Sequence, residues 1–343
     1  MNINRQYYNL VEKIYNEGFL YEDPNRKGVY RKQITDYTFE HNFKDGYPAI
    51  GLKQVYPKMA FNEMLAFMRG YTNLSQLEGL GVTFWRDDAF NYFESRYGKG
   101  SRTFDEWLGM VKAFPGHNYG DLGRIYSHQI RNWNNTLDQL DSVLERIKKA
   151  PLSTKNIVTM WNPTDLKDCA LSPCHTLFSF VTSPLKTEER EELISKEQFE
   201  YYYNNVKNSE KEEYFDSINI PKYGLKVLWD QFSVDTALGL PINIMYYSDV
   251  CYIFAHYLNM KPVGIKGNLA NVHLYDNSFD AVEEMLKRDI TEIEYPVEIE
   301  TNFPDNWEYL DDFLGKLEYG KSIKLLNYKH LGRLDIKMLA YSK

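Results

Sequence analysis

The sequence predicts a single α+β domain over residues 1–343, with a charged helical segment inserted into it. Segments with helical periodicity and segments with strand alternation follow one another in no fixed order, with no internal repeat and no low-complexity linker between them. Hydrophobic residues make up 43% of the chain, which is enough for one large core. The segment at about 184–222 differs because Glu, Lys and Tyr are dense in it, so we expect a solvated helical insertion there.

The first third of the chain is expected to supply two helices and one strand. Apolar residues recur at helical spacing over 5–17, which predicts an amphipathic helix. β-branched and aromatic residues alternate over 31–42, which predicts a strand. The helix expected over 58–68 is apolar almost throughout, with Glu63 as its one carboxylate.

The middle and last thirds continue this mixture of helices and strands. A strongly periodic helix is expected to begin at a cap formed by Asn135 or Thr136, with Leu137 on its apolar face, and to end before Pro151. The remaining patterns predict an apolar helix over 241–258 and strands over 156–161, 175–182, 225–234 and 263–275.

Charge and cysteine content argue against several classes of protein. The net charge of −8 predicts a surface that repels nucleic acid and anionic membranes, and no apolar run approaches the roughly 18 residues of a membrane span. Cys169, Cys174 and Cys251 are too few for a disulfide framework, and the histidines lack metal-ligand spacing. We therefore expect a cytoplasmic protein without a metal, a nucleic-acid partner or a membrane segment.

The tetrapeptide Ser172-Pro173-Cys174-His175 offers a thiol in a polar setting. A cysteine taken alone is more often a small buried hydrophobic residue. As a thiolate it can add to C6 of a pyrimidine and so activate C5, but this chemistry also needs hydrogen bonds to the O4/N3 edge and an acid–base relay. Asn243 can donate to O4 and accept from N3–H, and Glu63 is a carboxylate whose pKa burial would raise.

Several short strings around these residues carry a family resemblance. In chain order they are Asn25-Arg26-Lys27-Gly28, Asn62-Glu63-Met64-Leu65, Val82-Thr83-Phe84-Trp85, Gly120-Asp121-Leu122-Gly123-Arg124-Ile125-Tyr126, the Cys174 tetrapeptide, 231–243 and His273-Leu274-Tyr275. In this order they resemble the thymidylate synthases, folate-dependent enzymes that methylate deoxyuridine monophosphate at C5. The resemblance runs from about Tyr21 to about Met338, interrupted by the insertion.

The resemblance implies a mixed β-sheet packed with helices, a homodimer formed through that sheet, and 5,10-methylenetetrahydrofolate as co-substrate. It implies that Cys174 is the nucleophile, that Asn243 reads the uracil edge, and that Glu63 organises a proton relay with Tyr126 nearby. An aspartate at the position of Asn243 accompanies cytosine in related hydroxymethylases, so the asparagine favours uracil here.

The same resemblance implies two sets of binding residues. His273 and Tyr275 would hold the ribose 3′-hydroxyl and Ser233 would lie at the phosphate. The full substrate-binding set implied is Arg26, Lys155, Gln231, Ser233, His273 and Tyr275. The set implied for the folate is Phe84 and Trp85 for stacking, Asp235 for the pterin, and Leu238 and Gly239 for the pocket wall.

The chain departs from the family at the 5′-phosphate, which the family clamps with four arginines, two of them from the partner subunit. Arg26 matches the first arginine. Phe232 occupies the position of the second, and Thr154-Lys155 occupies the position of the adjacent pair. Because lysine lacks the planar fork with which arginine binds phosphate, these changes weaken the expected site.

Two explanations for these departures stay open. Other cations, such as Lys27, Arg124 or Lys226, have taken over the phosphate, or the substrate does not end in an ordinary 5′-monophosphate. The product is also open, because the C-terminal tail runs to Lys343, about one residue beyond the family's usual end. If that tail closes imperfectly, water in place of hydride would quench the intermediate and give a 5-hydroxymethyl product.

We therefore expect a transferase that converts dUMP to dTMP. The first alternative is a 5-hydroxymethylase that acts on deoxyuridylate or, as a weaker candidate, deoxycytidylate. The second alternative is a non-catalytic relative that binds a nucleotide.

Overall fold

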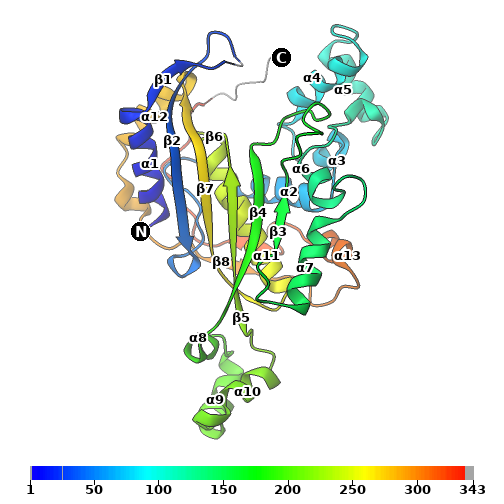
Figure 1. Cartoon of the computed structure of the whole chain (residues 1–343). Coiled ribbons are helices and arrows are strands. Elements are labelled where there is room, and N and C mark those ends of the chain that lie inside the picture. The colour runs from blue at the N-terminus through cyan, green and yellow to red at the C-terminus, as the bar shows by residue number, and fades with distance from the viewer. Residues whose placement is uncertain (1, 25, 337–343) are drawn as a thin grey trace.

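The computed structural model describes residues 2–24 and 26–336 and is organised around one mixed β-sheet (Figure 1). Its strands follow the order β1-β2-β7-β5-β4-β3, with β6 paired to β7 off that path. The bounds are β1 Phe19–Glu22, β2 Tyr30–Asn42, β3 Ile157–Thr159, β4 His175–Pro184, β5 Tyr223–Gln231, β6 Val234–Asp235 and β7 Lys261–Tyr275. β5 and β6 run parallel to β7, and the other pairs are antiparallel. The predicted α+β class is confirmed.

Two helices pack against this sheet, and a third packs against one of them. α1 (Ile3–Glu17) contacts β2 and β7, while α11 (Gly239–Tyr257) contacts β5 and β7 and also packs against α2 (Pro57–Met68). Local sequence explains where two of them begin. The Asn2 side chain accepts from the backbone N–H of Asn4 at the start of α1, and Pro57 occupies the first turn of α2, where its missing N–H costs nothing.

The opposite side of the sheet is more exposed. On β4, Phe178 and Phe180 are buried, whereas Val181 is 46% exposed. Ile157 on β3 pairs with Ser179 and is 49% exposed. Because successive side chains of a strand point to opposite faces, Ile157 and Val181 lie together on the side away from the core.

The helix expected after Asn135 or Thr136 begins later than predicted. α7 spans Gln139–Lys149, and its cap is Asp138, whose side chain accepts from the N–H of Asp141 at 3.0 Å. Asn135 has a positive φ of 59°, a conformation that asparagine tolerates, so the chain turns there before the helix starts. Leu137 therefore lies outside the helix and is 45% exposed.

Two other boundaries differ from expectation. The strand predicted over 225–234 divides at Phe232 into β5 and β6, and β3 is shorter than the predicted 156–161. The remaining elements are α3 Leu74–Gly79, α4 Arg86–Tyr97, α5 Phe104–Ala113, α6 Tyr126–Arg131, α12 Phe279–Leu286, α13 Leu310–Gly315, β8 Ile299–Thr301 and β9 Ile323–Leu325.

Between β4 and β5 the chain forms three short helices, α8 Thr187–Glu191, α9 Lys196–Asn205 and α10 Lys211–Ser217, which project from one end of the sheet (Figure 1). These helices have a small hydrophobic cluster of their own, separate from the main core. Arg190 on α8 is 3% exposed and joins this helix to α10, because its guanidinium pairs with Asp216 at 2.8 Å and with Glu212.

Candidate active site

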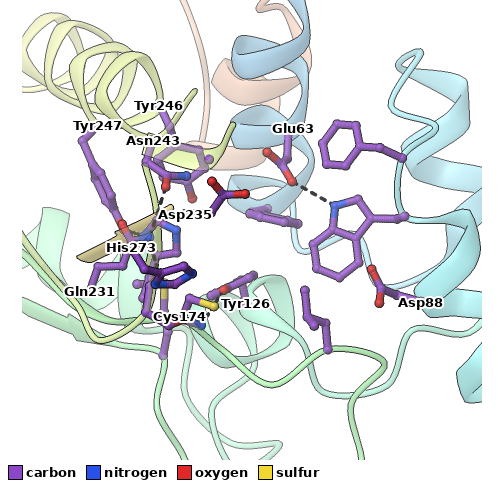
Figure 2. Close-up of a pocket in the computed structure, with 18 of the residues that line it drawn as sticks. Glu63, Asp88, Tyr126, Cys174, Gln231, Asp235, Asn243, Tyr246, Tyr247 and His273 are labelled. Atoms are coloured by element: carbon purple, nitrogen blue, oxygen red, sulfur yellow. Dashed lines mark hydrogen bonds between the residues drawn. The ribbon is translucent and has the colours of Figure 1, made fainter. Parts of the chain in front are cut away.

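A cavity of about 290 Å³ opens where the start of β4, the ends of β5 and β7, and helices α2, α4 and α11 meet (Figure 2). It collects nearly all of the residues that the sequence singled out. Those that line it are Arg26, Glu63, Phe84, Trp85, Tyr126, Cys174, Gln231, Ser233, Asp235, Gly239, Asn243, His273 and Tyr275.

Two residues of the expected site do not line this cavity. Leu238 lines a small neighbouring pocket beside Asp235. Lys155 is exposed on the turn before β3. The family resemblance implies that Thr154 and Lys155 reach the active site of a partner subunit, so a single chain does not place them at its own cavity.

Cys174 lies just before β4, with its backbone held against the hydroxyl of Tyr126. The Cys174 N–H donates to Tyr126 Oη at 2.8 Å. Burial raises the pKa of the Cys174 thiol, while hydrogen bonds with Ser233 and Tyr126 and the charge of Arg26 act in the opposite direction. The environment thus favours a thiol at rest and supplies two hydroxyl donors for the thiolate.

His175 directly follows Cys174 but carries no positive charge near neutral pH. Burial lowers the pKa of His175 to about 3. Its Nδ1 lies 2.8 Å from the hydroxyl of Tyr247 on α11. The imidazole therefore cannot lower the pKa of the neighbouring thiol as a cation would, and it ties the Cys174 loop to α11.

Glu63 on α2 faces the cavity and is bound by a tryptophan from the opposite wall. Trp85 Nε1 donates to Glu63 Oε1 at 2.9 Å (Figure 2). Burial raises the pKa of Glu63 to about 7, although the Trp85 hydrogen bond opposes the change. A carboxyl group that titrates near neutral pH can both accept and return a proton.

The amide of Asn243, in the first turns of α11, is oriented by Gln231 at the end of β5. Gln231 Nε2 donates to Asn243 Oδ1 at 3.2 Å and to the Ser233 carbonyl at 3.1 Å (Figure 2). This contact identifies the oxygen side of the Asn243 amide and leaves its Nδ2 hydrogens for other acceptors. The amide can therefore present one donor and one acceptor to a planar ring.

His273 on β7 has one ring nitrogen fixed and one without a partner. Its Nδ1 lies 2.7 Å from the Asn271 carbonyl, which only accepts, so Nδ1 carries the hydrogen. Burial lowers the pKa of His273, which leaves Nε2 as a neutral acceptor. Among the described residues this buried Nε2 has no hydrogen-bond partner, so it suits a hydroxyl of a bound molecule.

Asp235 on β6 stands at the start of α11. Its Oδ1 accepts from the N–H groups of Ala237 and Leu238 at 3.0 and 3.1 Å. These bonds fix the carboxylate at the edge of the cavity on the side where Gly239 also lines it. A fixed carboxylate in a cavity that Phe84 and Trp85 also line suits a flat ring that carries N–H donors.

The cations offered as replacements for the missing arginines do not reach the cavity. Arg124 pairs with Asp165 at 2.6 Å, and Lys226 pairs with Glu40. Lys27 is exposed. None of the three lines the cavity, so the first explanation of the changed phosphate site gains no support from a single chain.

Sequence reasoning missed several residues that line the cavity. Tyr246 and Tyr247 follow Asn243 by three and four residues on α11, so helical spacing could have identified them. Asp88 follows Trp85 by three residues in the first turn of α4 and could have been found in the same way. The full set of missed residues is Phe67, Asp88, Met160, Leu171, Tyr246 and Tyr247; His175, which also lines the cavity, belongs to the tetrapeptide that the sequence singled out.

Within residues 2–24 and 26–336, no helix is both long and apolar enough to span a bilayer. The same residues contain no cluster of three or more His, Cys, Asp or Glu side chains placed to hold a metal ion.

The sequence profile of the thymidylate synthase family matches residues 5–340. The chain is 28% identical over 286 residues to a thymidylate synthase of Mycoplasma genitalium, covering 83% of this chain and 85% of that protein. It is also 28% identical to thymidylate synthases of Malacoplasma penetrans, over 83% of this chain and 86% of the relative, and of Enterobacteria phage T4, over 84% and 82%.

The chain therefore belongs to a class of folate-dependent one-carbon transferases built on a mixed sheet. In particular, it is a member of the thymidylate synthase family. Its co-substrate is 5,10-methylenetetrahydrofolate, and the cavity fits such a molecule because it combines an aromatic wall with the fixed carboxylate of Asp235.

Proposed function

We propose that this protein transfers a one-carbon unit from methylenetetrahydrofolate to C5 of a deoxyuridine nucleotide, converting dUMP to dTMP by reductive methylation. The observation that carries the proposal is the convergence of a thiol, a titratable carboxyl group and an oriented amide, from Cys174, Glu63 and Asn243, on one cavity. Each of the three is held by a neighbouring side chain.

The reaction would begin with a bond between the Cys174 sulfur and C6 of the uracil. The electron pair of the C5–C6 double bond would move toward C5 and O4. Asn243 Nδ2 would donate to the developing O4 anion while Oδ1 accepts from N3–H, so the enolate is stabilised as it forms. The donor bond from Gln231 supports this orientation.

Capture of the one-carbon unit at C5 then requires the C5 proton to leave. We assign the proton relay to Glu63 and Tyr126, because the pKa of Glu63 near 7 lets the carboxyl group accept and return protons. Breakage of the carbon–nitrogen bond to the folate leaves a methylene group on C5. Hydride from tetrahydrofolate would reduce it to methyl, the sulfur would leave C6, and the products are dTMP and dihydrofolate.

The remaining residues would position the two substrates. His273 Nε2 would accept from the ribose 3′-hydroxyl beside Tyr275. The other substrate-binding residues we assign are Arg26 and Ser233 at the 5′ group and Gln231 beside the base. The residues we assign to the folate are Phe84, Trp85, Asp235, Leu238 and Gly239.

We also propose that the protein acts as a homodimer in the cytoplasm. The exposed apolar residues Ile157 and Val181 on the uncovered side of the sheet would pack against a second copy. That contact would carry Thr154 and Lys155 into the partner's cavity. Three cysteines without a disulfide suit a reducing compartment.

Hydroxymethylation is the second candidate, and one observation favours it. Asp88 lines the cavity on the same wall as Trp85, where its carboxylate could hold a water molecule near the reactive methylene (Figure 2). The tail whose closure would exclude water ends at Lys343 and lies outside the described residues.

Release of tritium from dUMP labelled at C5, measured with methylenetetrahydrofolate, tests the proposal. Mass spectrometry of the nucleotide then separates a methyl from a hydroxymethyl product. Absence of tritium release from the wild-type protein, with Cys174→Ser as the blank, would contradict both enzymatic candidates and favour a non-catalytic nucleotide-binding relative.

A further inference from the structure

The cavity is poor in positive charge. Among residues 2–24 and 26–336, Arg26 is the only arginine or lysine that lines it, whereas the carboxyl groups of Glu63, Asp88 and Asp235 line it as well. The Arg26 guanidinium lies 5.1 Å from the centre of the Tyr275 ring, which places it beside the ribose end. A 5′-phosphate bound there would contact one guanidinium group, that of Arg26.

The next guanidinium along the chain is already engaged. Arg31 pairs with Asp23 at 3.3 Å and also donates to the hydroxyl of Tyr21. The Arg31 and Asp23 side chains are 14% and 4% exposed, so the pair is largely buried and breaking it would cost stability. Arg31 is therefore engaged within the β1–β2 hairpin, and we do not assign it to phosphate binding.

Phe232 stands where a second cation would be useful. It lies between Gln231 and Ser233, which both line the cavity, but its own side chain does not line it and is 60% exposed. Its backbone is fixed on both sides, since its N–H donates to the Cys174 carbonyl at 2.8 Å and its carbonyl accepts from Asn271 at 2.8 Å. The chain thus holds an uncharged, solvent-facing side chain at the margin of the site.

We infer that this active site reads the 5′ end of its substrate through the single fork of Arg26, and that it accepts deoxyuridine 5′-phosphodiesters alongside the monophosphate. One guanidinium binds two phosphate oxygens, and an esterified phosphate still offers two unbridged oxygens. The second negative charge of a monophosphate has no second guanidinium to bind it and lies in a cavity rich in carboxyl groups. The inference rests on the proposed function, because it names the substrates of the same site.

A second copy would not change this conclusion. In the proposed dimer Lys155 would add one ammonium group, which is a point charge without the geometry for paired oxygens. Phe232, at the margin of the site, adds no charge that would favour a monophosphate over an ester.

The test compares tritium release from three substrates labelled at C5: dUMP, its 5′-methyl ester and deoxyuridine. We expect kcat/KM for the methyl ester within about tenfold of dUMP, and deoxyuridine lower than either by roughly 10- to 100-fold, because only deoxyuridine loses the bond to Arg26. A preference for dUMP over its ester of more than about 100-fold would overturn the inference and leave the proposed function intact. No release from any of the three would overturn both.

Phe232→Arg offers a second test, because a second guanidinium at the edge of the site should bind the second negative charge of a monophosphate. We expect the ratio of kcat/KM for dUMP to that for the methyl ester to rise by about tenfold or more. Tyr203→Arg is the matched control, since Tyr203 is an exposed aromatic residue of α9, 76% exposed and far along the chain in the insertion. Unchanged deoxyuridine turnover shows that the variant folds, and an unchanged substrate ratio in that folded variant counts against the inference.

Discussion

The two ends of the cavity differ in how many of their polar side chains are held in place and in how much positive charge they carry. At the proposed base end, Cys174, Glu63 and Asn243 each accept or donate a hydrogen bond that fixes their position. At the proposed 5′ end, Arg26 is the only described lysine or arginine that lines the wall. Groups that touch reacting atoms stabilise the transition state, whereas a remote phosphate contributes mainly binding energy. The cavity therefore holds its side chains firmly where the proposed chemistry takes place and offers a single cation where the 5′ group is proposed to bind.

The largest expected effect belongs to the nucleophile. Cys174→Ser should lower kcat by about 10⁴-fold or more, because an alcohol at this position is not ionised near neutral pH and cannot add to C6. Single-turnover tritium release measures this loss. The matched control is Cys251→Ser, a buried cysteine outside the cavity, which should alter stability more than turnover. Comparable losses in the two variants would contradict the assignment.

Changing Asn243, the residue proposed to recognise the base, should alter the preference for uracil over cytosine more than the rate of turnover. Asn243→Asp replaces the donor that faces O4 with an acceptor, so we expect the ratio of kcat/KM for dUMP to that for dCMP to fall by about 1000-fold. Competition between the two nucleotides in one reaction gives this ratio directly. A variant that loses both activities equally would indicate that Asn243 supports the fold of the site and does not select the base.

The proton relay should show an intermediate effect with a distinctive pH profile. Glu63→Gln keeps the size of the side chain and its bond from Trp85 but removes the titrating group, so kcat should fall by about 10²- to 10³-fold. The wild-type profile of kcat/KM should bend near the pKa of about 7 that burial gives Glu63 in the free protein, and the variant should lose that bend. A bend that persists in the variant would assign it to another group.

The same substitution should reveal a cost in stability. The pKa of Glu63 is raised from 4.5 to about 7, so the folded state binds its proton more tightly than the unfolded state. The resulting stability is fully present below pH 4.5 and is lost as the pH rises through 7, by roughly 3 kcal/mol at most. Between pH 5 and about pH 8, the free energy of unfolding of Glu63→Gln should therefore rise relative to that of the wild type. Parallel curves for the two proteins would contradict a buried, titrating Glu63.

The smallest effect is expected at the 5′ end. Arg26→Ala should lower kcat/KM for dUMP by about 10- to 100-fold, the loss of one charge-assisted contact, with kcat nearly unchanged at saturation. Turnover of deoxyuridine, which has no phosphate, should change much less. A loss as large as that of Cys174→Ser would show that the two ends of the cavity are equally important for the reaction.

The sequence predicted the mixed α+β class and most of the residues around the cavity because both depend on short contiguous strings. The Cys174 tetrapeptide supplies Cys174 and His175, and the segment 231–243 supplies five residues of the cavity wall. A polar residue in an apolar segment can be recognised without knowing the fold. Glu63 is an example, because a carboxylate is unusual in an apolar helix whatever that helix packs against.

Other features depend on distances across the fold and could not be predicted. The cap of α7 is Asp138 because Asn135 adopts a left-handed turn, and no pattern of apolar residues records that conformation. The neutral state of His175 results from burial against Tyr247, which lies 72 positions away in the sequence. Arg124 carries a charge that suits a phosphate, yet its pairing with Asp165 depends on tertiary structure.

The three-helix segment between β4 and β5 has a consequence for how the protein folds. Pro184 and Tyr223 are partners in the sheet, so the ends of a long connection meet in space. Closing a disordered loop of that length would cost entropy before the two strands gained any contact. Because α8, α9 and α10 gather around Arg190 and their own apolar cluster, they can assemble locally and bring those ends together. β4 and β5 then meet almost as the arms of a hairpin, which would let the strand that ends at Gln231 form early.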